Sequence, residues 1–181
     1  MNVRFGSASQ LIERLSALHR NLLRRFANEE ELQLVHVEIL QYLSICNHYS
    51  NTTQSISEYL GQTKGSISQS LSILEQNNFI KRVQNKVDKR IYHIVLTSKG
   101  ESVSKRLSDA ISFEKTKEFD PVFEEVLVSI QKQNRFKGFG ICGSCKHNQN
   151  PMKNIFICGL TKEKLSIDDI KKICREHQEA I

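Results

Sequence analysis

Four cysteines lie close together in the last quarter of the sequence. Cys142 and Cys145 form a Cys-x2-Cys pair, Cys158 follows after twelve residues, and Cys174 after fifteen more. Thiolates are ligands for soft metal ions, and a two-residue gap lets both thiolates of a pair reach the same ion. The N-terminus has no apolar signal core, so we expect a reducing cytoplasm, where metal binding is favoured over disulfides. The sequence therefore predicts a metal site made by these four cysteines.

Two kinds of metal centre fit this spacing. Zinc sites usually combine two close pairs, and Cys174-x2-His177 would supply the second pair with His177 as an alternative ligand. An iron–sulfur cluster accepts single cysteines at irregular spacing. We favour Zn²⁺ slightly and keep the iron–sulfur cluster as the alternative, with free thiols or a redox disulfide as the third interpretation. Zinc would only fold this segment, whereas a cluster would make the protein a sensor.

Two further residues of this chemical type are given no metal role. Cys46 lies on the apolar face of a predicted helix, where a cysteine usually behaves as a small buried hydrophobe. His147 is expected to be a surface residue.

A second group of residues has the chemistry to bind nucleic acid. Ile67, Leu71 and Leu74 recur at helical spacing, so short polar side chains between them face away from the core. Of these, Gln69 can bond the edge of adenine through two hydrogen bonds, and the serines are less selective. The outward-facing polar residues are Lys64, Ser66, Ser68, Gln69 and Ser72, and of these Gln69, Ser66 and Ser68 are the predicted base contacts. The predicted phosphate contacts are Thr63, Lys64 and Ser70.

A polar loop at residues 85–89 continues this group. Arg90, beside the loop, has the reach to enter a narrow minor groove, while Lys86 and Lys89 would add phosphate contacts that depend on salt concentration. From Gln62 to Lys99 the sequence has seven basic and two acidic residues, so positive charge gathers where these side chains lie. The pattern predicts binding to double-stranded DNA.

The surrounding sequence predicts the elements that would hold these side chains. Apolar residues at helical spacing predict helices over residues 8–27 and 31–47. A short helix capped by Thr52 or Thr53 closes at Gly61, and Thr63 caps the next helix, which ends at residues 77–78. Residues 79–84 and 91–96 are predicted strands. A helix capped by Thr97 or Ser98 is expected to reach about residue 118, and another runs from Pro121 to about residue 132.

This order predicts a mainly α fold with a small β-hairpin wing, an α+β winged helix-turn-helix flanked by dimerisation helices. Gly138-Phe139-Gly140 marks a boundary. We therefore expect a DNA-binding and dimerisation domain over residues 1–135 and a small cysteine-rich metal module over residues 136–181.

Composition limits the other functions. The 181-residue chain has a net charge of +6 and a pI near 9.1. It has no run of 18 apolar residues, so no membrane partner is expected. It has no Ser/His/Asp order, phosphate loop or paired carboxylates, so an enzyme is not expected. An electron-transfer protein built on the cysteines, or a protein-interaction module that uses the winged helix as a scaffold, remains the alternative, and the basic loop argues against the latter.

The register of these motifs resembles the MarR family of bacterial regulators. The resemblance rests on residues 53–61, on Thr63-Lys64-Gly65-Ser66-Ile67-Ser68, on Leu74-Glu75, and on Asp88-Lys89-Arg90 followed, after five intervening residues, by Leu96-Thr97-Ser98-Lys99-Gly100. It implies a homodimer held by the first and last helices, acting as repressor or activator on a pseudo-palindromic site. It also implies that Arg90 is the wing arginine and that Asp88 orients it. The cysteine-bearing tail departs from the family pattern, and a small effector stays unidentified.

Together these features predict a sequence-specific transcriptional regulator that binds double-stranded DNA as a homodimer. A two-fold axis would place two recognition helices on half-sites about one helical turn apart. The cysteines would make the regulator responsive to metal or redox state.

Overall fold

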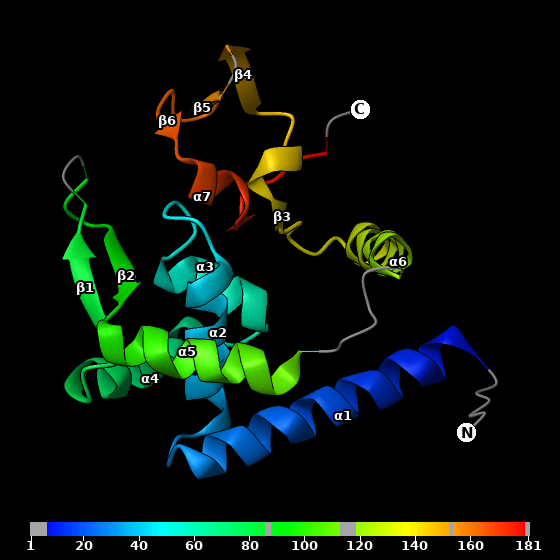
Figure 1. Cartoon of the computed structure of the whole chain (residues 1–181), viewed down its shortest axis with the longest axis vertical. Coiled ribbons are helices and arrows are strands. Elements are labelled where there is room, and N and C mark those ends of the chain that lie inside the picture. Colours follow the sequence, from blue (N-terminus) through cyan, green and yellow to red (C-terminus); the bar gives the residue numbers. More distant parts are fainter. Residues whose placement is uncertain (1–6, 86–87, 113–118, 153, 180–181) are drawn as a thin grey trace.

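The structure is a computed structural model that describes residues 7–85, 88–112, 119–152 and 154–179. Its first part contains α1 (Ala8–Glu29), α2 (Leu34–Ile45), α3 (Thr53–Leu60), α4 (Lys64–Gln76), β1 (Ile80–Gln84), β2 (Tyr92–Leu96), α5 (Ser98–Ile111) and α6 (Asp120–Gln133). The tail contains β3 (Gly140–Ile141), the short helix η1 (Cys142–Ser144), β4 (Asn148–Met152), β5 (Ile155–Cys158), β6 (Lys164–Leu165), α7 (Ile167–Ile170) and β7 (Ile173–Cys174). The mainly helical fold with a hairpin wing is confirmed (Figure 1).

The helix-turn-helix begins and ends at the residues that the sequence indicates. The Oγ1 atoms of Thr52 and Thr63 accept hydrogen bonds from the third backbone N–H of α3 and α4, each at 3.2 Å. Gly61 ends α3 with φ +64°, a left-handed conformation that glycine adopts without the steric cost of a Cβ. These two caps and one glycine fix the turn between the helices.

The wing is joined to α5 through a close backbone approach. The strands β1 and β2 pair antiparallel, with Ile80 opposite Leu96. Thr97 then caps α5, because its Oγ1 accepts a hydrogen bond from the Gly100 N–H at 3.3 Å and donates one to the Asn78 carbonyl at 2.6 Å. A Cβ on Gly100 would lie 2.1 Å from the Phe79 carbonyl oxygen. Glycine is therefore required at this position for α5 to pack against the start of the wing.

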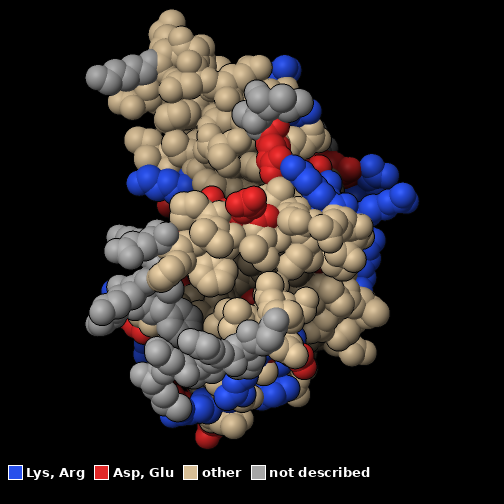
Figure 2. All heavy atoms as spheres, turned by 90° about the vertical axis from the view of Figure 1, so that its right-hand side faces the viewer, with Lys and Arg blue, Asp and Glu red and all other residues tan. Residues whose placement is uncertain are grey.

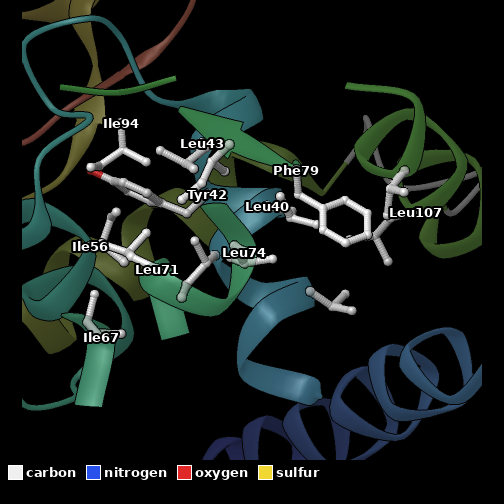
Figure 3. Close-up of a cluster of buried hydrophobic side chains, with 14 of the residues drawn as sticks. Leu40, Tyr42, Leu43, Ile56, Ile67, Leu71, Leu74, Phe79, Ile94 and Leu107 are labelled. Atoms are coloured by element: carbon white, nitrogen blue, oxygen red, sulfur yellow. The ribbon is translucent and has the colours of Figure 1, made fainter. Parts of the chain in front are cut away.

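The hydrophobic core is centred on α2, whose side chains are buried on several sides. Figure 3 shows Tyr42 among Ile56 and Ile94, with Phe79 and Leu107 packed together nearby. The inner face of α4 joins this core through three fully buried residues, Ile67, Leu71 and Leu74. The core therefore holds α4 with one face inward and the other exposed.

Helices α1 and α6 differ from the others because they expose large apolar side chains. The exposed set is Leu11, Ile12, Leu15 and Leu18 on α1 and Val122, Phe123, Leu127 and Ile130 on α6. Only the C-terminal end of α1 contributes to the core, and the described residues of α6 contribute none. Figure 2 views the side of the molecule on which α6 lies, and uncharged residues cover most of that face.

The prediction that the helix after the wing reaches residue 118 is wrong. Helix α5 ends at Ile111, because Ser112 has an extended backbone conformation with φ −68° and ψ 141°. Residues 113–118 lie outside the described part of the chain. None of the helices described is both long and apolar enough to span a membrane.

The tail has its own small core and packs on the helix-turn-helix. Strands β3 and β7 pair with each other, and β4, β5 and β6 form a three-stranded sheet. Its buried residues Cys142, Leu165 and Cys174 pack against Tyr49, which belongs to the loop between α2 and α3. The ring of Phe139 packs edge-on against Tyr59 of α3 with the ring centroids 5.1 Å apart.

Candidate nucleic-acid interface

Helix α4 presents a polar outer face that its own core positions. Because the core holds the apolar residues of α4 inward, the opposite side of its first two turns is open to solvent. The exposed residues include most of the predicted contacts, namely Thr63, Lys64, Ser66, Ser68 and Gln69. Gly65 lies among them, and a Cβ added there would have no atom within 4 Å, so backbone and side chains here are both accessible.

Two of the predicted DNA contacts on α4, Ser70 and Ser72, have a structural role within the protein instead. Ser70 is only 7% exposed and lies on the core side of the helix, so its hydroxyl is not available for the predicted phosphate contact. The Ser72 hydroxyl donates to the Ser68 carbonyl at 3.0 Å and accepts from Arg82 at 3.3 Å. Arg82 also forms an ion pair with Glu75 at 2.8 Å. Ser72 and Arg82 therefore fasten β1 to α4, a role that the helical spacing alone did not reveal.

The wing presents Arg90 in a fixed orientation. The Asp88 carboxylate accepts hydrogen bonds from Nε and Nη2 of Arg90 at 3.0 and 2.9 Å, and from its backbone N–H at 3.0 Å. These bonds lower the pKa of Asp88 below its ordinary value, so the carboxylate stays charged at neutral pH. The Arg90 side chain is 91% exposed. It thus combines solvent access with restricted orientation, as the resemblance implied for this pair.

The other two basic residues of the wing are Lys89 and Lys86. Lys89 is exposed, and its backbone carbonyl accepts a hydrogen bond from Gln84 at 2.7 Å. Lys86 lies outside the described residues, so its predicted phosphate contact has no structural account.

A hydrogen-bonded chain of side chains connects the wing to the loop before α3. Asn85 accepts a hydrogen bond from the Asp88 N–H at 3.0 Å, and its Nδ2 lies 3.0 Å from Nε2 of His93. The other ring nitrogen of His93 lies 2.6 Å from Oδ1 of Asn51. Burial lowers the pKa of His93, which favours the neutral ring that can donate at one nitrogen and accept at the other. Sequence reasoning missed these three residues because their partners are up to 42 positions apart.

The four tail cysteines line one small cavity. Cys142, Cys145, Cys158 and Cys174 surround a space of about 40 Å³, together with Asn47, Tyr49, His147 and Asn148. All four are free thiols. Burial and the neighbouring thiols raise the pKa of Cys142 to about 12. Residues up to 32 positions apart in sequence are therefore brought together, as a shared metal site would require.

Both histidines of the tail are half-buried, and His147 lines the cavity of the four cysteines whereas His177 does not. His147, expected at the surface, is half-buried and lines the cavity. His177, the alternative ligand, lies against Gly140 instead, and its Nε2 is 3.0 Å from the Ser144 hydroxyl. In the described part of the chain, no three His, Cys, Asp or Glu side chains converge in a way that could hold one metal ion.

A larger cleft lies between the end of α2, the wing and α5. It has a volume of about 550 Å³ and is lined by polar and apolar residues that include Asn51, Ser104 and Lys105. This volume falls within the range of small-molecule sites.

The sequence of the helix-turn-helix and wing matches a known family. The sequence model of the MarR family matches residues 36–92, which run from α2 to the start of β2. Over these residues the chain is similar to the MarR family. No curated protein matches the sequence closely enough to add to this assignment.

Solved structures share the fold of the MarR-family domain. Wild-type MarR from E. coli in the apo form is 15% identical with a TM-score of 0.53, covering 70% of this chain and 98% of its own. CouR from Rhodococcus jostii RHA1, bound to p-coumaroyl-CoA, is 14% identical with a TM-score of 0.56, covering 71% and 92%. Reduced AbfR bound to DNA is 25% identical with a TM-score of 0.52, covering 70% and 94%. At this identity the likeness establishes the fold.

Proposed function

We propose that this protein is a transcriptional regulator that binds a pseudo-palindromic site in double-stranded DNA as a homodimer. The observation that carries the proposal is the paired presentation of α4 and the wing. Five exposed polar residues at the start of α4 and the oriented Arg90 lie on elements that the core and the Ser72–Arg82 contact hold together. MarR-family regulators and the DNA complex of AbfR support this interpretation.

In this proposal α4 enters the major groove and the wing reaches the neighbouring minor groove. Gln69 reads a base edge, and Ser66 and Ser68 contribute less selective contacts. Thr63, Lys64 and Lys89 bind phosphates and set the register of the protein on the duplex. Arg90 enters the minor groove, where a narrow A·T tract attracts a cation.

The exposed apolar residues of α1 and α6 support the homodimer. A monomer would leave these side chains in water, and the first and last helices of the domain are the ones that the family resemblance assigns to dimerisation. A second copy would bury these side chains and carry the second recognition helix to the other half-site. A small effector would find room in the 550 Å³ cleft, whose walls include the wing and α5.

The test begins by selecting duplexes from a random double-stranded DNA library with the purified full-length protein. We expect a two-fold symmetric consensus. On the selected duplex, Arg90→Ala and Gln69→Ala should each weaken binding by about tenfold or more, in line with roughly 1–3 kcal/mol for a good base contact.

The matched control is Lys164→Ala, which removes an exposed positive charge from β6 in the tail, away from the proposed contacts. It should change affinity by less than twofold. Recovery of no consensus, or equal affinity for the two variants and the parent protein, would contradict the proposal.

A further inference from the structure

The cavity between the four cysteines contains polar groups that lack a partner. Among the described residues, four buried side-chain atoms have no hydrogen-bond partner, and three of them belong to residues that line this cavity, Asn47, His147 and Asn148. Asn47 is the clearest case, since it is 1% exposed and its Nδ2 donates to nothing. Buried polar atoms are nearly always paired, so the Nδ2 donor of Asn47 indicates a missing acceptor inside the cavity, whereas Oδ1 of Asn148 is itself an acceptor without a donor.

The shape of the site favours a polynuclear group over a single ion. Zinc requires four ligands within about 2.3 Å of one point. The described side chains do not converge in this way, and a cavity of about 40 Å³ separates the thiols. An iron–sulfur cluster is wider, because its four cysteines are shared among two or four iron atoms, and its sulfides accept hydrogen bonds from N–H donors. Apolar residues Leu165, Phe156 and Ile170 pack around the cysteines and limit access of water.

The last of the four cysteines is built into the contact with the helix-turn-helix. Ile173, the residue before Cys174, accepts a hydrogen bond from the Asn47 N–H at 2.9 Å and forms a parallel bridge with Cys46. Arg175, the residue after Cys174, donates from Nε and Nη2 to both carboxylate oxygens of Glu58 at 2.5 and 2.8 Å. A group bound by Cys174 therefore acts directly on the strand that joins the tail to α3.

That strand contacts the loop that also supports the wing. The Arg175 N–H donates to the hydroxyl of Ser50 at 2.8 Å, and the next residue, Asn51, pairs with His93. The Asn51 carbonyl also accepts a hydrogen bond from the N–H of Ile94 at 2.7 Å. The loop over residues 46–51 is thus held by the tail on one side and by β2 on the other.

We propose that Cys142, Cys145, Cys158 and Cys174 bind an iron–sulfur cluster, and that its occupancy holds the 46–51 loop in the arrangement that supports DNA binding. This inference rests on the proposed DNA-binding function for its second half only. On binding, each thiol loses its proton to solvent as its sulfur bonds to iron. Asn47 donates its free N–H to a sulfur of the cluster.

The site is tested on full-length protein purified without oxygen. We expect a coloured protein with iron and acid-labile sulfide in equal amounts, about two or four of each per chain. Cys158→Ala should lose both. Cys46→Ala, which removes a buried thiol outside the cavity, should keep both. A colourless protein with one zinc per chain, or protein with neither metal nor sulfide, would overturn the cluster.

A second variant keeps the test informative if Cys158→Ala does not fold. Asn47→Asp keeps the oxygen that accepts the Tyr49 N–H but removes the unpartnered donor. It should retain the cluster and lose iron to a chelator several times faster than the parent protein. An unchanged rate would remove Asn47 from the site.

The link to DNA is tested with the selected duplex described above. Protein stripped of its cluster by a chelator should bind that duplex at least tenfold more weakly than loaded protein. Equal affinities would overturn the link. A loaded protein that selects no duplex would refute the proposed function and leave the iron and sulfide result standing.

Discussion

At the scale of single residues, charged side chains divide into those that hold the protein together and those that remain available. Arg82 is engaged by Glu75 and Ser72, and Arg175 by Glu58. Arg90 pairs with the neighbouring Asp88 and stays exposed. An arginine oriented by its own element and open to solvent is the type of residue that a DNA groove can use.

Asp88→Asn tests whether orientation of Arg90 contributes to binding. The neutral amide cannot hold both guanidinium nitrogens as the carboxylate does, so Arg90 would sample more orientations. We expect the affinity for the selected duplex to fall by a few fold, which is less than for Arg90→Ala. The loss is expected even though the variant has one negative charge fewer than the parent protein, a change that by itself would favour binding to DNA. A gain in affinity from the lost negative charge would contradict the orienting role. Fluorescence anisotropy at two salt concentrations measures this.

Glu58 gives a prediction for pH. Hydrogen bonds from Arg175 lower the pKa of Glu58 below its ordinary value of 4.5. A group with a depressed folded-state pKa contributes stability above its unfolded pKa, and this contribution is lost as the pH falls through the folded pKa. The contact between tail and α3 should therefore weaken below about pH 4.5. In Glu58→Gln, urea unfolding followed against pH should show a shallower loss of stability in that acid range, and identical curves would contradict it.

The residue-scale predictions that succeeded were local in sequence. The caps at Thr52 and Thr63 join positions three apart, so the sequence pattern reveals them. The Asp88–Arg90 pair, two positions apart, was implied by the family resemblance. The role of Ser72 could not be predicted in this way, because the helical period does not show that its hydroxyl accepts a hydrogen bond from Arg82 on a later strand. The chain from Asn51 through His93 to Asn85 depends on strand register and loop approach, which are tertiary properties.

At the scale of elements, two glycines shape the connections of the helix-turn-helix and of the wing. Gly61 closes α3 in a left-handed conformation, and Gly100 lets α5 approach the Phe79 carbonyl. The two glycines act by different physics. A side chain at Gly61 meets no atom within 4 Å and would suffer only backbone strain, whereas one at Gly100 would clash.

Gly61→Ala and Gly61→Asn separate backbone strain from crowding. Alanine in the left-handed region costs about 1 kcal/mol, whereas asparagine tolerates it better. We expect Gly61→Ala to lower the free energy of unfolding by about that amount and Gly61→Asn by less than half of it. Equal losses would mean that contacts at the turn, not φ, decide the cost. Chemical denaturation monitored by circular dichroism gives both values.

The boundaries of elements were predicted well where caps or turns mark them and poorly elsewhere. Helix α5 ends at Ile111, seven residues before its predicted end at 118. The prediction ran too far because no capping or breaking signal in the sequence marks Ser112. In the tail, none of the strands β3 to β7 was predicted. Three of them, β3, β6 and β7, have two residues each, which is too short for a periodic pattern.

At the scale of the whole molecule, the apolar surface is distributed unevenly. The N-terminal half of α1 and the whole of α6 expose leucine, isoleucine, valine and phenylalanine side chains, while the core of the domain is closed. The basic residues are distributed differently, since they gather on and around the wing, and Lys64 lies at the start of α4. One surface therefore suits a second copy of the chain and another suits a polyanion.

Leu15→Glu combined with Leu127→Glu tests the first of these surfaces. Charges at exposed positions should leave the fold of the isolated domain intact, but burying them in an interface is costly. We expect a monomer by light scattering, an unchanged circular dichroism spectrum, and at least tenfold weaker binding to the selected two-fold duplex. A dimer of unchanged affinity would exclude these faces as the interface.

The bond between Ser50 and Arg175 joins positions 125 residues apart, and it has a consequence for synthesis. The helix-turn-helix leaves the ribosome long before the segment that fastens its loop. A nascent chain can fold its core early, yet it acquires the support from the tail only after residue 175 has emerged. Ribosome-bound chains halted before this point would present α4 and the wing without that support. The contact between this loop and the tail therefore forms only after residue 175 has emerged.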